Sequence, residues 1–421
     1  MDNSFEAGVE PMRPDWAMVA LCLLIVLMDG LDTQTIGFNA VAIARATGIP
    51  IAAFGQIFSA GLLGAALGAC CLGPVGDRFG RWPTLMASVI VFAVSSFVLP
   101  QMKSVAALLT CRFVTGVGLG AALPNLLALC AELVPRRLRG VVTGALFAGI
   151  PAGGFVGAML TAHVAPKLGW PWVFYLGGAV PLVIVIVMAI TAARQRAWTK
   201  ADHRYTQTEI TTTRQLPRVS PRDVLSAIGA GPTLLLWSVS LTCFVVLIDV
   251  ALWTSPLLHQ LGTHETTTAL VVGVFNLGSV LGTLCGGSLL DRYRPQVTLP
   301  LSFLAGAIAV CMLGQSGGNT LLLDIFALLT GAFIGSTSAQ LLAIAVLIYP
   351  ASIRASGVGG VVAIGRFGQV FAPLAVGSLL KHAASVGHIY LVIASPAFVA
   401  VLLSLLLCRT TAVRQSIALP K

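Results

Sequence analysis

Long apolar runs recur along the whole of this sequence, and they constrain its fold more than any other feature. Each run has about 20 residues, the length that a helix needs to cross the hydrocarbon core of a membrane. A transmembrane helix satisfies its own backbone hydrogen bonds in lipid, so the runs predict an all-α membrane protein with twelve transmembrane helices. They lie near residues 17–40, 52–73, 83–101, 105–129, 140–164, 170–193, 232–257, 268–290, 297–314, 320–346, 356–380 and 386–408.

The composition agrees with a chain that is solvated by lipid. Of its 421 residues, 57% are apolar and only 10% are charged, whereas a soluble domain carries about 25% charged residues. The formal net charge of +10 would suit a nucleic-acid partner, but the placement of the basic residues favours a membrane. Cysteine and histidine do not occur at the spacing of a zinc site, and we expect neither a metal nor an organic cofactor.

The lysines and arginines indicate how the spans are oriented. Cytoplasmic loops of membrane proteins carry an excess of these residues. If both termini are cytoplasmic, 19 of the 25 lysines and arginines fall in cytoplasmic segments. The exceptions are Arg45, Lys103, Lys167 and Lys381 in outer loops, and Arg112 and Arg366 within spans. We therefore expect both termini in the cytoplasm, the lipid bilayer as a partner and no nucleic acid.

A polar segment divides the chain into two groups of six spans. Residues 194–231 are rich in threonine, arginine and glutamine and contain no long apolar run. We interpret this segment as a cytoplasmic linker. It joins an N-terminal six-helix bundle, residues 1–193, to a C-terminal six-helix bundle, residues 232–421.

A weak internal repeat relates the two groups. Asp77-Arg78 follows the second span and matches Asp291-Arg292 after the eighth span, 214 residues later. The sequence PRRLR at 135–139 matches PASIR at 350–354 with an offset of 215 residues. Parallel six-span repeats occur in one large class of secondary transporters, whose substrate site lies between the halves near the membrane midplane. We therefore expect two pseudo-symmetric bundles with a site between them.

Four segments carry a resemblance to known families. GPVGDRFGR at 73–81 resembles the signature loop between spans 2 and 3 of the major facilitator superfamily. DGLD at 29–32 resembles a span 1 motif of the aromatic acid:proton symporter family. RFVTGVGLGAALPN at 112–125 resembles span 4 of that family, and IRASGVG at 353–359, followed by GRFG at 365–368, resembles its span 11. Together with the spans, the resemblance covers residues 17–408 except for the linker.

The resemblance implies the major facilitator fold and a proton-coupled secondary transporter. It implies import of a small aromatic carboxylate, similar to a hydroxyphenylpropionate or a hydroxybenzoate, by alternating access across a bacterial inner membrane. Protons would be the coupling ion, and we expect a monomer. Two departures stand out. The second signature loop has Arg294 where the first has Gly80, and Asp249 in the seventh span has no counterpart in the family pattern.

Five charged residues lie in the middle of predicted spans: Asp29, Asp32, Arg112, Asp249 and Arg366. Such a residue costs about 2.5–3.5 kcal/mol on insertion scales, so it usually faces a cavity or a charged partner. At about 1.5 Å per residue, Asp32 and Arg112 reach similar depths in the bilayer. Arg366 falls near the midplane of its span. These charges are therefore the first candidates for a central site.

Their chemistry gives them roles. Burial disfavours the charged form of a carboxyl group, so Asp32, together with Asp29, is a candidate to carry the coupling proton. A guanidinium group binds a carboxylate through two parallel hydrogen bonds, so Arg112 or Arg366 would hold the substrate. The alternative is a structural Asp–Arg pair that orders spans 1 and 4. A further candidate for the cavity wall is the carboxyl group of Asp249. The amides of Asn125, Gln340 and Asn276 are candidates as well, and each could equally form a hydrogen bond between helices.

The loops next to the repeat motifs contain a second set of charges. The resemblance implies a cytoplasmic gate, in which Asp77 would meet a helix N-terminus or Arg139 when the site opens outward. The alternative is a set of solvated charges that only fix topology. The full set is Asp77, Arg78, Arg81, Glu132, Arg139, Asp291, Arg292 and Arg354.

Glycines at small-xxx-small spacing occur in several spans. Gly64/Gly68, Gly153/Gly157 and Gly282/Gly286 each place two glycines on one helix face. This spacing lets helices approach closely, and packing within the bundle explains it more simply than a dimer surface does.

Other functions fit the sequence less well. GQSGG at 314–318 has the hydrolase G-x-S-x-G pattern, but it lies in a short loop between spans and lacks the strand–turn–helix context. We therefore do not expect this protein to be an enzyme. An exporter, a transporter of a different organic anion, and a transporter-like sensor that binds without transport remain open.

Overall fold

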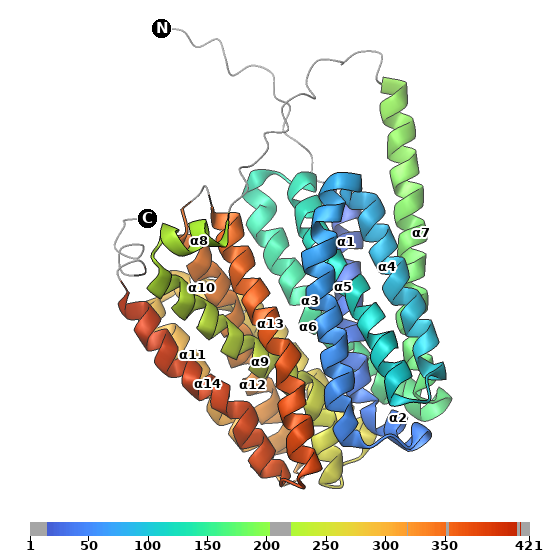
Figure 1. Ribbon diagram of the computed structural model, residues 1–421, viewed down its shortest axis with the longest axis vertical. Coiled ribbons are helices and arrows are strands. Elements are labelled where there is room, and N and C mark those ends of the chain that lie inside the picture. The colour runs from blue at the N-terminus through green and yellow to red at the C-terminus, as the bar shows by residue number, and fades with distance from the viewer. Residues whose placement is uncertain (1–14, 203–219, 318, 351–352, 411–412, 414–421) are drawn as a thin grey trace.

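The computed structural model describes residues 15–202, 220–317, 319–350, 353–410 and 413. Every regular element in these ranges is helical. The long helices run roughly parallel to one another and form two groups side by side (Figure 1). Their bounds are α1 Trp16–Phe38, α2 Ala40–Thr47, α3 Phe54–Phe79, α4 Arg81–Val98, α5 Val105–Leu133, α6 Arg139–Leu168, α7 Pro171–Asp202, α8 Pro221–Ala227, α9 Ala230–Gln260, α10 Glu265–Arg292, α11 Pro295–Gln315, α12 Thr320–Ile348, α13 Arg354–Lys381 and α14 Val386–Arg409. Short 3₁₀ turns cover Ile51–Ala53, Leu99–Gln101 and Arg136–Leu138.

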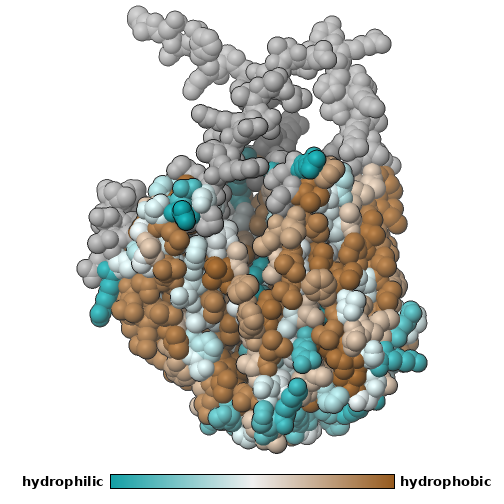
Figure 2. All heavy atoms as spheres, viewed as in Figure 1, coloured by the Kyte–Doolittle hydropathy of each residue, from teal (hydrophilic) through white to brown (hydrophobic). Residues whose placement is uncertain are grey.

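Twelve helices in the described part of the chain are long and apolar enough to cross a membrane. Each predicted span begins and ends within four residues of one of them. The all-α, twelve-span prediction is therefore confirmed. The exterior supports it: apolar side chains cover the middle of the molecule, and hydrophilic ones gather at its ends (Figure 2).

The chain between the two groups is more helical than the sequence indicated. Helix α7 continues to Asp202, beyond its expected end at residue 193. Alanine, arginine, glutamine and lysine favour a helix in water, so the helix need not stop where the apolar run does. Helix α8 also lies within the predicted linker. It begins with a capping box in which Ser220 and Asp223 each accept a backbone N–H.

Within each group, the helices pack in equivalent pairs. In the first group α1 packs on α6, α3 on α5 and α4 on α7, while in the second α9 packs on α13, α10 on α12 and α11 on α14. The groups meet where α6 packs on α10 and where α3 packs on α13. Helices α3 and α10 are the second spans of their groups, and α6 and α13 are the fifth, so each contact joins a second span to a fifth span. The molecule therefore has the pseudo-symmetry that the repeat predicts.

The glycine pairs lie where helix backbones approach most closely. A Cβ on Gly64 would collide with the backbone of Phe113 in α5, and a Cβ on Gly153 would collide with the backbone of Leu27 in α1. A Cβ on Gly282 would meet the backbone of Ala332 in α12. The interpretation of these glycines as packing positions is confirmed, because a side chain there has no room.

Candidate functional site

A cavity of about 940 Å³ lies between the two bundles. It is lined by residues of both bundles and is mostly apolar, with walls that include Phe147 and Phe244. It extends to Arg139 at the start of α6 and to Ser288 near the end of α10. Both lie at the end of the molecule where the linker joins α7 to α8, which we call the linker end. The cavity therefore approaches the linker end.

The opposite end, which we call the far end, is closed by direct contacts between the bundles. Gly37 of α1 lies against the backbone of Leu252 in α9. A Cβ added to Gly37 would lie only 2.8 Å from the carbonyl oxygen of Leu252. The rings of Phe58 and Trp253 meet edge to face at 5.2 Å. The hydroxyl of Ser255 donates to the backbone oxygen of Phe38 at 3.4 Å.

A charged cluster adds to this closure at the surface. Arg45 of α2 forms an ion pair with Glu265 of α10, with 2.6 Å between Nη1 and Oε1. The same guanidinium group contacts His259 of α9, with 2.7 Å between Nη2 and Nε2. These contacts join the two bundles, so the structure is open toward the linker end and shut at the far end.

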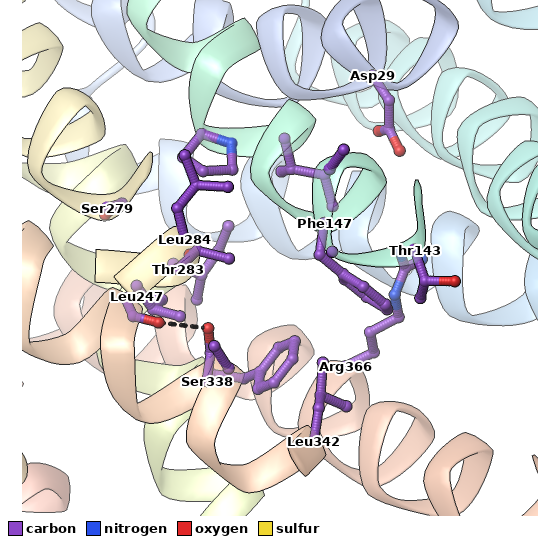
Figure 3. A pocket seen from close by; sticks show the side chains of 18 of the residues that line it. Asp29, Thr143, Phe147, Leu247, Ser279, Thr283, Leu284, Ser338, Leu342 and Arg366 are labelled. Carbon is purple, nitrogen blue, oxygen red and sulfur yellow. Dashed lines mark hydrogen bonds between the residues drawn. The ribbon is translucent and has the colours of Figure 1, made fainter. Parts of the chain in front are cut away.

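Two predicted charges line the cavity from opposite bundles. Asp29 of α1 and Arg366 of α13 both contribute to its wall, and they lie on opposite walls (Figure 3). Asp29 accepts a hydrogen bond from the hydroxyl of Thr33, one helical turn further on, at 3.3 Å. The two charges therefore face a common space.

Asp32 and Arg112 form a buried ion pair inside the N-terminal bundle. Arg112 Nη1 lies 2.9 Å from Asp32 Oδ2, and the side chains are 4% and 2% exposed. The hydroxyl of Ser96 in α4 donates to the other oxygen of Asp32. The pair thus joins α1, α4 and α5. Neither side chain lines the large cavity; a void of about 20 Å³ adjoins Arg112. This geometry favours the structural alternative for Arg112.

The other three substrate-binding candidates lie away from the cavity wall. Asn125 donates to the backbone oxygen of Ala121 at 2.8 Å. Gln340 donates to the hydroxyl of Ser302 in α11 at 3.2 Å. Asp249 is 4% exposed, and its Oδ1 has no hydrogen-bond partner among the described residues. The two amides thus make local or interhelical bonds.

The predicted gating charges lie around the linker end. Arg139 lines the cavity there. Arg78 lies over the ring of Phe79 at 5.4 Å, and Arg292 lies over the ring of Tyr293 at 5.9 Å. Arg354 donates to the backbone oxygen of Tyr349 at 3.5 Å. Arg81 begins α4. The side chains of Asp77, Glu132 and Asp291 lie outside the described residues.

The sequence interpretation missed some polar residues of the cavity wall. Gln34 lines the cavity five residues after Asp29, and Gln369 lines it three residues after Arg366. Gln369 lies on the same helix face as Arg366, three residues away, so helical spacing from Arg366 would have found it. Gln34 is five residues from Asp29 and lies on a different face of α1, so its only signal in the sequence was a polar residue inside an apolar run.

The family comparison covers almost the whole described chain. Residues 22–257 and 245–420 match the model of the Major Facilitator Superfamily. The 4-hydroxybenzoate transporter of Pseudomonas aeruginosa is 34% identical over 388 residues, which is 86% of each chain. The 3-(3-hydroxyphenyl)propionate transporter of Escherichia coli is 35% identical over 364 residues, again 86% of each chain.

The solved structures give the same fold. The crystal structure of a D-xylose–proton symporter superposes with a TM-score of 0.74 and 16% sequence identity. The match covers 93% of this chain and 97% of that one. At this identity the likeness shows only a shared arrangement of the helices. The relationship to the transporters named above rests on the sequence matches.

Proposed function

This chain belongs to the Major Facilitator Superfamily and, within it, to the aromatic acid transporters, a family of membrane transporters and not of enzymes, and we propose from this that it imports a hydroxylated aromatic carboxylate together with protons. The observation that carries the proposal is the facing of Asp29 and Arg366, from opposite bundles, across one cavity.

The cavity has the size and lining for such a substrate. Small-molecule pockets have volumes of about 300–1,000 Å³ and combine apolar walls with a few placed polar groups. This cavity, of about 940 Å³, has aromatic walls and two opposite charges. An aromatic ring suits the apolar surface, and a carboxylate suits the arginine.

Arg366 is the proposed carboxylate anchor. Its guanidinium group is always charged and can bind both carboxylate oxygens at once. It has no ion-pair partner among the described residues, in contrast to Arg112. The sequence left the choice between the two arginines open, and the geometry favours Arg366.

Asp29 is the proposed proton carrier. A substrate carboxylate on Arg366 and an ionised Asp29 would repel one another across the cavity, so a proton on Asp29 favours substrate binding. Proton and substrate would then stabilise the same occluded state, as symport requires. Asp32 is bonded to Arg112 and Ser96 inside the N-terminal bundle. In this proposal it supports Asp29 and does not exchange the proton with the cavity directly.

The direction of the opening completes the proposal. The loops at the linker end hold most of the basic residues, and basic loops stay in the cytoplasm. We therefore assign the linker end and both termini to the cytoplasm of a bacterial cell. The structure is then open inward, and rocking of the bundles about the central site would open the far end to the exterior.

Uptake into proteoliposomes tests this function. The substrate panel contains 3-(3-hydroxyphenyl)propionate, 4-hydroxybenzoate, benzoate and a sugar, with an inward proton gradient. We expect wild-type protein to accumulate an aromatic acid and to lose it when the gradient collapses. Asp29→Asn should retain binding and exchange but lose gradient-driven accumulation, and Arg366→Ala should lose substrate binding.

Asp324→Asn is the matched control. Asp324 is another aspartate of a membrane-spanning helix, α12, and it does not line the cavity. We expect this variant to accumulate substrate as wild type does. Binding without accumulation would support a sensor, and accumulation only under an outward gradient would support an exporter. Either result would overturn proton-coupled import.

A further inference from the structure

A pair of amide side chains joins the two bundles at the cavity wall. Gln34 of α1 donates from Nε2 to Asn276 Oδ1 of α10 at 3.1 Å. Asn276 donates from Nδ2 to Gln34 Oε1 at 2.7 Å and to the backbone oxygen of Val272 at 3.0 Å. The pair is therefore reciprocal and links residues 242 positions apart in sequence.

The surroundings of this pair leave it little freedom. Gln34 is 6% exposed and Asn276 is 1% exposed, yet both line the cavity. Gly154 of α6 lies directly against them, because a Cβ there would meet both Gln34 Nε2 and Asn276 Oδ1. Three helices from two bundles thus form the amide site, and a glycine makes room for it.

The position along α1 places the pair beyond the two charges. Gln34 follows Asp29 by five residues, which is about 7.5 Å along the helix axis toward the far end. A benzene ring with a substituent at each end has comparable length. Arg366 lies across the cavity from Asp29, so a ligand that holds its carboxylate on Arg366 would direct the opposite end of its ring toward the amides.

The hydrogen-bond inventory defines what would bind there. Each amide has two N–H donors and a carbonyl oxygen with two lone pairs. The three hydrogen bonds of the pair use both donors of Asn276 and one donor of Gln34. One donor of Gln34 and further lone pairs on both oxygens remain. A hydroxyl group donates and accepts, and so matches this set, whereas a carboxylate only accepts.

The pair also connects this chemistry to the movement of the bundles. Because α1 and α10 belong to different bundles, opening of the far end must separate or shift the two amides. A buried amide that loses its partner is costly unless another group replaces it. A hydroxyl bound between the two side chains would supply that replacement as the bundles move.

We propose that Gln34 and Asn276 bind the ring hydroxyl of a phenolic acid and make the transporter prefer it to the same acid without the hydroxyl. This inference rests on the proposed function, since it needs an aromatic carboxylate on Arg366. It assigns the specificity for the ring substituent to a bridge between the bundles, separate from the charges that bind the carboxylate and the proton.

Binding to the purified full-length protein in nanodiscs tests the inference with two ligand pairs. They are 4-hydroxybenzoate with benzoate, and 3-(3-hydroxyphenyl)propionate with 3-phenylpropionate. The readout is the ratio of dissociation constants within a pair, which a purely structural role of the amides would not change. We expect wild type to bind the better-fitting hydroxylated acid about tenfold more tightly than its partner, as one satisfied buried hydrogen bond allows.

The main variant is Gln34→Met with Asn276→Leu, which removes both amides and keeps their shape. Replacing both partners by apolar groups is better tolerated than orphaning one. We expect its ratio to fall to about one while the acid without the hydroxyl still binds. Gln340→Met, which removes a buried amide that does not line the cavity, is the matched control and should keep the wild-type ratio.

A second variant keeps the test valid if the double variant does not fold. Gly154→Ala retains both amides and displaces them, and we expect it to lower the ratio. Gly144→Ala on the same helix, where an added Cβ meets nothing within 4 Å, should keep it. An unchanged ratio in the double variant or in Gly154→Ala, or equal affinity within both pairs in wild type, overturns the inference alone. Binding of none of the four acids overturns the proposed function and the inference together.

Discussion

At the residue scale, the intramembrane charges divide into two kinds that look alike in sequence. Asp29 and Arg366 face a cavity, whereas Asp32 and Arg112 neutralise one another inside one bundle. Asp29 and Asp32 are three residues apart and both lie in the DGLD motif. Depth in the bilayer could be estimated from the sequence, but the direction of each side chain depends on how α1 is rotated against its neighbours.

The Asp32–Arg112 pair gives a prediction about stability. Arg112→Leu leaves Asp32 buried and uncompensated, and loss of one partner of such a pair costs about 3–5 kcal/mol. We expect a large fall in melting temperature in detergent. Replacing both partners, with Asp32→Asn and Arg112→Gln, should restore most of it.

The double variant separates the two roles of Arg112. If the pair is structural, Asp32→Asn with Arg112→Gln is folded and still binds an aromatic acid. If Arg112 binds the substrate carboxylate instead, the double variant is stable but has no affinity for the acid, and Arg366→Ala retains it. That combination would contradict the assignment of Arg366.

At the element scale, the helices are positioned by small residues at their crossings. Gly153 places α6 against the backbone of α1 near Leu27, and this contact determines where Gly154 and the amide site lie. Spans are uniformly apolar, so apolar burial alone does not select a rotation about the helix axis. In lipid, close backbone packing supplies that selection.

Two alanine variants on α6 test this. Gly153→Ala forces a Cβ against the backbone of Leu27, which cannot move aside as the end of a flexible side chain could. Such overpacking costs about 1–3 kcal/mol. We expect a lower melting temperature. Gly144→Ala adds the same methyl group in open space, where the higher helix propensity of alanine leaves stability unchanged or slightly raised. Equal melting temperatures for the two variants would show that the crossing is not tight.

At the scale of the whole molecule, the structure represents one state of the proposed alternating-access cycle. The far end is shut by backbone contact at Gly37 and Leu252 and by the cluster of Arg45, Glu265 and His259. The arginine is 63% exposed and the glutamate 36%, and exposed ion pairs contribute little each. The cluster therefore adjusts the balance between the states, and packing supplies most of the closure.

Charge reversal at this cluster tests that balance. Arg45→Glu places two acids together, and we expect it to shift the population a few-fold toward the state open at the far end. The readout is the rate at which a membrane-impermeant maleimide labels Ser255→Cys, which lies at the seal. The swap Arg45→Glu with Glu265→Arg should return the rate to that of the parent protein.

Two further points make this measurement decisive. The exposed Cys70, Cys71 and Cys285 are replaced by serine beforehand, so that the labelling reports position 255. Labelling of intact cells by reagent added outside would also support the assignment of the far end to the exterior. An unchanged rate in Arg45→Glu would mean that the cluster does not affect the equilibrium between states.

The sequence by itself determined the spans, the all-α class, the pseudo-symmetric halves and the family. The physical reason is that insertion of a span is a local property of about 20 residues against lipid, and the motifs are local as well. The charges of the proposed site were also visible, because an ionisable residue in an apolar run stands out.

Only the tertiary structure decided which of those residues meet. It placed Arg366 and not Arg112 on the cavity, paired Gln34 with Asn276 across 242 positions, and closed one end of the molecule. These outcomes depend on the rotation of each helix about its axis and on crossings between distant glycines and backbones. No single run of sequence contains that information, because it arises only when the helices pack.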